Sequence, residues 1–152
     1  MLLALRANES GKLYALVDPA QDPGVIGRIA QDAAANACLF GYALDSPIAK
    51  ATPRVVAILD VQSSALFTWI ARHAPHKPVA TLMISQLPLD ALAEHLQQQM
   101  DVKLHGVGAM FLAFWDPSIL GTLVGQADDE TLHVAGPVLD AEQLRRFLSI
   151  RN

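Results

Sequence analysis

The sequence predicts an α/β fold, with a mixed, largely parallel β-sheet of about five to six strands and helices on both of its faces. Two observations support this prediction. Apolar runs of strand length recur along the chain, and stretches with helical periodicity lie between them. A strand with one solvent-exposed face alternates apolar and polar residues, whereas a continuous apolar run is typical of a strand that is buried on both faces. Strands of parallel sheets are usually buried in this way.

The strands are predicted from these apolar runs in chain order. Four principal runs are Leu13 to Val17, Val55 to Leu59, Val79 to Ile84 and Ala109 to Phe114. Two shorter strands are predicted at Val102 to His105 and at Thr131 to Val134. A glycine-containing turn follows His105, so we expect the 102–105 strand and the Phe111 run to form a hairpin.

The helices are predicted where apolar residues recur at steps of three and four. These segments are Gly24 to Ala35, Ser64 to Arg72, Leu89 to Gln99 and Pro117 to Val124. A last helix is predicted from Asp140, where a sequence resembling a capping box precedes apolar residues. Because no linker or internal repeat interrupts the chain, we expect one domain over residues 1–152.

Composition narrows the classes of function. The 152 residues are 52% hydrophobic and 17% charged, which suits one domain with its own core. The net charge is −4 and the basic residues are scattered, so no nucleic-acid partner is expected. No apolar run approaches the roughly 18 residues of a membrane-spanning helix, and the single cysteine, Cys38, lies in an apolar run typical of a buried thiol. We therefore expect a cytoplasmic protein with no membrane partner.

Three of the predicted strands end in aspartate, at Asp18, Asp60 and Asp116. Because the carboxyl ends of parallel strands meet at one edge of a sheet, these carboxylates could together hold Mg²⁺ and activate water. A small metal-dependent hydrolase is therefore the alternative hypothesis. The competing interpretation is helix capping, since Asp18 and Asp116 each precede a proline, as a capping aspartate often does. Capping is the favoured interpretation.

Other catalytic patterns are missing from the sequence. The histidines do not have the spacing of metal ligands, and neither a Gly-x-Ser-x-Gly nucleophile turn nor a phosphate-binding glycine loop is present. A binding protein without a cofactor is therefore favoured over an enzyme.

The aromatic residues are candidates for a protein-binding surface, because such side chains dominate interface hot spots. They are Phe111, Phe114 and Trp115, with Phe67 and Trp69 on another segment. Phe67 and Phe111 are predicted to pack in the core. For Trp115, which lies beside a predicted helix cap, both a core and a surface position remain open.

The run Leu13 to Asp18, together with the aromatic-Asp-Pro-x-x-Leu pattern within Phe111 to Leu120, resembles the DUF4123 family. The resemblance extends through Leu39-Phe40, the Thr52 to Val56 stretch and the helix in Ser85 to Leu96. Members of this family are non-enzymatic adaptor chaperones of the bacterial type VI secretion system. They bind a toxic effector protein and help to load it onto the trimeric spike protein.

The resemblance implies partner-binding residues at the motif positions. These are Tyr14, Asp18, Phe40, Phe114, Trp115, Asp116 and Pro117. Two positions depart from the family pattern, because Ala113 stands where an arginine is usual and Trp115 where a tyrosine is common. Many members continue into a second, helical lobe, so this chain is expected to be a one-lobe member or the first lobe of a longer protein.

Overall fold

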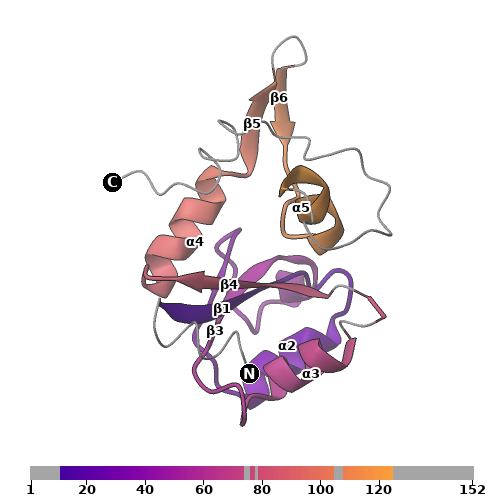
Figure 1. Cartoon of the computed structure of the whole chain (residues 1–152). Coiled ribbons are helices and arrows are strands. Elements are labelled where there is room, and N and C mark those ends of the chain that lie inside the picture. The colour runs from indigo at the N-terminus through magenta and orange to yellow at the C-terminus, as the bar shows by residue number, and fades with distance from the viewer. Residues whose placement is uncertain (1–10, 74–75, 78, 105–107, 125–152) are drawn as a thin grey trace.

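The computed structural model describes residues 11–73, 76–77, 79–104 and 108–124. A four-stranded sheet lies between two layers of helices (Figure 1). Its strands are β1 (Lys12–Val17), β2 (Asn36–Cys38), β3 (Arg54–Ile58) and β4 (Ala80–Ser85), in the spatial order β2-β3-β1-β4. Each neighbouring pair is antiparallel.

The prediction of a largely parallel sheet of five to six strands is wrong, because this sheet has four strands and only antiparallel pairings. The helices do connect strands of the same direction: α2 (Gly24–Gln31) leads from β1 to β2, and α3 (Ala65–His73) leads from β3 to β4. In each case, however, an opposed strand lies between the two connected strands. The apolar runs therefore indicate that both faces of the sheet are buried, and not that its strands are parallel. An antiparallel sheet is also buried on both faces when helices cover both sides.

Helices α2 and α3 lie side by side on one face of the sheet (Figure 1). Together with this face of the sheet they enclose a hydrophobic core that is almost inaccessible to solvent. Its buried members are Leu13, Ala15, Val17, Val25, Ile29, Val56, Ile58, Leu66, Trp69, Ile70 and Val79. Every second residue of β1 belongs to this core, as the alternation of side chains along a strand requires.

Helices α4 (Leu89–Gln98) and α5 (Pro117–Val124) lie on the opposite face (Figure 1). The core on this side is smaller, and its main contributors are Tyr14 and Leu16 of β1 and one face of α4. Its buried members are Tyr14, Leu16, Leu39, Val55, Leu92, Ala93, Leu96 and Phe114. Both faces of β1 are thus covered, which explains its unbroken apolar sequence.

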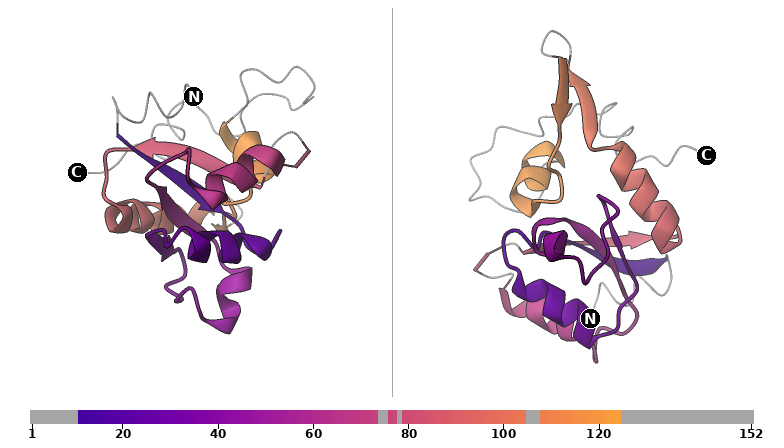
Figure 2. Two further views of the ribbon diagram at one scale, coloured as in Figure 1. Left: turned by 90° about the horizontal axis from the view of Figure 1, so that it is seen from below. Right: turned by 180° about the vertical axis from the view of Figure 1, so that it is seen from behind.

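Strands β5 (Asp101–Leu104) and β6 (Gly108–Phe111) form the predicted hairpin as a separate two-stranded sheet. The hairpin projects away from the main sheet on the side of α4 and α5, as the view from behind in Figure 2 also shows. The run predicted as one strand to Phe114 ends at Phe111, because the chain then turns into α5.

Two short elements were not predicted, the strand β2 and the 3₁₀ helix η1 (Pro47–Ala51). The helix predicted over 24–35 ends earlier, at Gln31, where Asp32 caps the helix and Ala33 has a positive φ of 47°. The chain can then enter β2 directly. The strand predicted at 131–134 and the helix predicted from Asp140 lie outside the described residues.

Within the described ranges, no helix has both the length and the apolar character needed to cross a bilayer.

Candidate functional site

Three aromatic side chains meet at the surface on the α4 and α5 side of the molecule: Phe40, Phe111 and Trp115. The Phe40 and Phe111 rings are stacked with their centroids 5.9 Å apart. Trp115 makes edge-to-face contacts with both rings, with centroid distances of 5.7 Å to Phe40 and 5.4 Å to Phe111. We call these three residues the aromatic cluster.

The aromatic cluster is open to solvent although its members are large and apolar. Phe40 is 40% exposed, Phe111 is 54% exposed and Trp115 is half-buried. Below them, Phe114 is 1% exposed and contacts Trp115 with a centroid distance of 5.8 Å. Because Phe114 belongs to the core beneath, it links the exposed rings to the rigid part of the fold.

Phe40 lies far along the sequence from Phe111 and Trp115, which are near each other in the chain. Phe40 lies in the turn after β2, Phe111 is the last residue of β6, and Trp115 lies two residues before the start of α5. Contacts of edge-to-face and stacked rings each add about 0.5–1.5 kcal/mol beyond area burial. The contacts of Phe40 with Phe111 and Trp115 therefore hold together two parts of the chain that the local backbone alone would leave independent.

The turn that carries Phe40 has its own support. The backbone amide of Leu39 donates to the Pro53 carbonyl at 3.0 Å, and the Leu39 carbonyl accepts from Gln97 Nε2 at 3.1 Å. Gly41 has a φ of +78°, a conformation that favours glycine, and its amide donates to the Cys38 carbonyl at 3.1 Å. The chain therefore reverses direction tightly at Phe40 and presents the ring outward.

Trp115 is placed by the start of α5. The Asp116 carboxylate accepts a hydrogen bond from the Ser118 amide at 2.8 Å, and Pro117 is the first residue of the helix. This is the capping arrangement that the sequence predicted. Asp116 and Pro117 thus hold Trp115 in place without lying in the aromatic cluster themselves.

Two of the predicted partner-binding residues belong to the interior. Tyr14 is 1% exposed, and its hydroxyl donates to the Leu87 carbonyl at 2.8 Å. Burial raises the pKa of Tyr14 above its ordinary value. Phe114 is equally buried, so the structure places both residues in the core and brings only Phe40 and Trp115 of the predicted set to the aromatic cluster.

Asp18 forms a turn at the end of β1, where its carboxylate accepts from the Ala20 amide at 3.0 Å. Burial raises the pKa of Asp18, and hydrogen bonds from Ala20 and Gln21 and the charge of Lys77 only partly oppose this. The negative charge of Asp116 adds to the increase in pKa. Asp18 and Asp116 are therefore electrostatic neighbours.

Asp60 lies at the opposite edge of the sheet from Asp18. Residue Leu13 pairs with Ile58 and Val17 pairs with Arg54, so the end of β3 lies beside the beginning of β1. The site of three aspartates required by the hydrolase hypothesis is therefore not assembled, because the antiparallel order separates Asp60 from the other two. No group of three metal-ligating side chains occurs among the residues that the structure describes.

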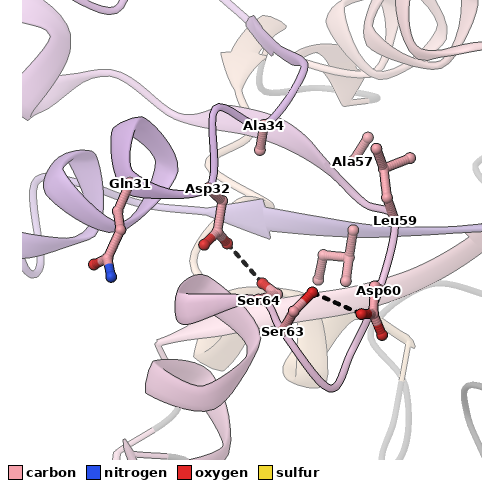
Figure 3. A pocket seen from close by; sticks show the side chains of 9 residues that line it. Gln31, Asp32, Ala34, Ala57, Leu59, Asp60, Ser63 and Ser64 are labelled. Atoms are coloured by element: carbon pink, nitrogen blue, oxygen red, sulfur yellow. Dashed lines mark hydrogen bonds between the residues drawn. The ribbon is translucent and has the colours of Figure 1, made fainter.

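A pocket of about 350 Å³ lies at the Asp60 edge (Figure 3). Its two carboxylates, Asp32 and Asp60, are already engaged in turns and caps. Asp32 accepts from Ser64 Oγ at 2.7 Å, from the Ala65 amide at 2.7 Å and from the Leu66 amide at 3.0 Å, and therefore caps α3 from a distant part of the sequence. Burial opposes ionisation of Asp32, but the hydrogen bonds from Ser64, Leu66 and Ala65 outweigh it and lower its pKa.

The other carboxylate of this pocket, Asp60, is also occupied. It accepts from Ser63 Oγ at 2.6 Å and from the Gln62 amide at 2.9 Å, and these bonds lower the pKa of Asp60. The two dashed contacts in Figure 3 are the Asp32–Ser64 and Asp60–Ser63 bonds. Both carboxylates stabilise local structure, so neither is available as a reactive group in this pocket. The rim of the pocket includes the apolar side chain of Leu59, which is 91% exposed.

The sequence-based assignment of the aromatic residues was partly wrong. Phe111 was predicted to be in the core and is one of the most exposed large apolar residues described, because the hairpin carries it away from the sheet. Phe67 packs partly buried against the α2 and α3 core, and Trp69 is a buried member of that core. The one sequence signal for the exposure of Phe111 was the glycine-containing hairpin turn before it, which marks a strand that can leave the main sheet.

A family model described as "Domain of unknown function (DUF4123)" matches residues 13–134. The matched region begins in β1 and includes the three residues of the aromatic cluster and the α5 cap. No curated protein and no solved structure is significantly similar to the chain.

Proposed function

The chain belongs to the DUF4123 family, and from this membership we propose that it is a non-enzymatic adaptor chaperone that binds a type VI secretion effector. In this role it assists the loading of the effector onto the trimeric spike protein in the bacterial cytoplasm, without a cofactor. The observation that carries the proposal is the aromatic cluster, an exposed group of three rings on a well-packed scaffold.

The aromatic cluster has the features of a protein-binding surface. Interface hot spots are enriched in aromatic side chains that are rigidly held and surrounded by groups that exclude water. Phe40, Phe111 and Trp115 hold one another in contact, and Phe114 anchors them to the core. A partner that covers these rings would remove apolar area from water without first having to order them.

The polar residues of the family motif take a supporting role in this proposal. Asp116 and Pro117 start α5 and so fix the position of Trp115, while Tyr14 ties the sheet to the Leu87 carbonyl at the entry to α4. The effector is therefore expected to contact Phe40 and Trp115 of the motif residues, with Phe111 added from the hairpin.

The proposal is tested by affinity purification of the tagged chain from its native bacterium, with mass spectrometry of the proteins that accompany it. We expect a secreted toxin or a spike protein in the wild-type sample. In Trp115→Ala its recovery should fall by about tenfold or more, as is typical of a hot-spot residue. Circular dichroism and thermal unfolding verify that the variant is folded.

Leu59→Ala is the matched control, because Leu59 is a large exposed apolar residue that does not belong to the aromatic cluster. It directly follows the last residue of β3, Ile58. Its replacement should leave the recovery of the partner unchanged. Equal recovery with wild-type, Trp115→Ala and Phe40→Ala proteins would exclude the aromatic cluster as the effector-binding surface. Absence of any toxin or spike protein from the wild-type sample would contradict the adaptor role itself.

A further inference from the structure

Arg54, the first residue of β3, is buried although it carries a charge. Its exposed fraction is 2%, and it is among the largest fully buried side chains. Nη1 donates to Asn36 Oδ1 at 2.9 Å and Nη2 donates to the Tyr42 carbonyl at 2.6 Å. Both acceptors are neutral groups.

The guanidinium is also incompletely satisfied. Within the described residues, Arg54 Nε is the buried side-chain atom that has no hydrogen-bond partner. A buried donor without a partner destabilises the fold, and replacing buried ionic groups by apolar side chains of similar volume is often neutral or stabilising. Stability alone therefore does not account for an arginine at this position.

The contacts of Arg54 act on the segment that carries Phe40. Before Phe40, the chain is held at Leu39, whose side chain is 1% exposed and whose two backbone groups are hydrogen-bonded to Pro53 and Gln97. After Phe40, the chain is tied back to β3 by the short bond from Arg54 Nη2 to the Tyr42 carbonyl. The turn is therefore held on both sides of the aromatic ring.

The second attachment matters because of Gly41, which lies between Phe40 and Tyr42. Gly41 has a φ of +78°, and glycine has more accessible backbone conformations than any other residue. The bond from the Gly41 amide to the Cys38 carbonyl holds the amide of this glycine but leaves the course of the chain after it free. Fixing the Tyr42 carbonyl removes that freedom and so fixes the direction of the Phe40 ring towards Phe111 and Trp115.

We infer that Arg54 is a positioning residue for the aromatic cluster, which it assembles by clamping the Tyr42 carbonyl and thereby holding the Phe40 ring against Trp115. The inference deepens the proposed function and rests on it for its biological meaning. The rigid guanidinium reaches the Asn36 side chain and the Tyr42 carbonyl from two separate nitrogens, whereas a lysine would have to reach both acceptors from its single ammonium nitrogen.

The test compares the wild-type protein with Arg54→Met, which keeps a long side chain and removes every donor. The readout is the nuclear Overhauser effect (NOE) between the ring protons of Phe40 and the indole of Trp115, measured together with thermal unfolding. We expect Arg54→Met to remain folded and to lose most of this NOE intensity. In the affinity purification above, it should lose about as much effector as Phe40→Ala, roughly tenfold.

Asn36→Ala is the matched control, because it removes the Nη1 acceptor and leaves the bond to the Tyr42 carbonyl. Its Phe40–Trp115 NOE should persist. Arg54→Lys, with one ammonium in place of the fork, should recover part of the NOE. If Arg54→Met does not fold, Arg54→Lys takes its place in the same measurement, and a weakened NOE is again expected.

A folded Arg54→Met or Arg54→Lys protein with an undiminished Phe40–Trp115 NOE would overturn the inference, as would an equal loss of the NOE in Asn36→Ala. These outcomes are independent of the proposed function, because the NOE requires no partner. Loss of effector in Phe40→Ala combined with full retention in Arg54→Met would reject the role of Arg54 while leaving the aromatic cluster as the binding surface.

Discussion

The two faces of the sheet use aromatic side chains differently. On the α2 and α3 face, Trp69 is 8% exposed and packs inside a continuous apolar core. On the α4 and α5 face, the core is smaller and three aromatic rings lie at its outer margin. The α2 and α3 face is closed by its own helices, whereas the other face leaves Phe40 and Phe111 exposed at its margin. The comparison separates aromatic residues that are buried inside the fold from those that lie exposed at its surface.

The largest effect on stability is expected for the tryptophan of the closed face. Trp69→Ala should lower the free energy of unfolding by about 3–5 kcal/mol, because it leaves a cavity in a packed core. Trp115→Ala should cost less than about 2 kcal/mol, since half-buried side chains lose less contact area. Chemical denaturation of both variants measures the difference. Similar losses would show that Trp115 is a core residue and would remove the contrast between the faces.

The cap of α3 is the next largest contribution, and it belongs to the closed face. Asp32→Ala removes the acceptor for Ser64, Ala65 and Leu66 and should cost about 2 kcal/mol, at the upper end for a helix cap. Asp32→Asn keeps one acceptor oxygen and should cost less. Denaturation midpoints distinguish the two variants. An unchanged midpoint for Asp32→Ala would mean that α3 is held by its apolar face alone.

The cap of α5 tests the open face in the same way. Asp116→Ala should cost about 1 kcal/mol, because it removes the acceptor of the Ser118 amide. It should also weaken effector recovery if α5 fixes the direction of Trp115. Thermal unfolding and the affinity purification are the two measurements, with Asp22→Ala, a comparable turn aspartate before α2, as control. A binding loss in both variants would point to a general loss of stability.

The smallest effect on stability is expected from pH, and it has opposite signs for the carboxylates of Asp32 and Asp18. Hydrogen bonds lower the pKa of Asp32 in the folded protein, so its stabilising contribution is present above its ordinary pKa of about 3.9 and is lost as the pH falls through the lowered value. Burial and the neighbouring Asp116 raise the pKa of Asp18, so its ionisation destabilises the fold once the pH rises through the raised value.

Asp18→Asn should therefore increase the thermal stability slightly at neutral pH, because the amide keeps the acceptor for the Ala20 amide without the charge. The gain should vanish below about pH 3, where aspartate is protonated in both states. Asp32→Asn should instead lose stability at neutral pH. Thermal unfolding of both variants across this range measures the two signs, and a loss of stability for Asp18→Asn would contradict the account of Asp18.

The sequence by itself determined the features that depend on near neighbours along the chain. It located β1, β3, β4, the β5–β6 hairpin and the helices α2, α3, α4 and α5, because apolar periodicity and turn residues act locally. It also predicted the cap formed by Asp116 and Pro117, and its motifs identified the family. These features do not depend on the order or direction of the strands in the sheet.

Only the tertiary structure decided which strands became neighbours and which rings reached the surface. The same apolar runs fit a parallel or an antiparallel sheet, since burial of both faces depends on the covering helices and not on strand direction. The antiparallel order moved Asp60 away from Asp18, and the hairpin carried Phe111 out of the core. Contacts such as Asp32 with α3, or Arg54 with the Tyr42 carbonyl, join residues far apart in the sequence, and no local pattern specifies such pairings.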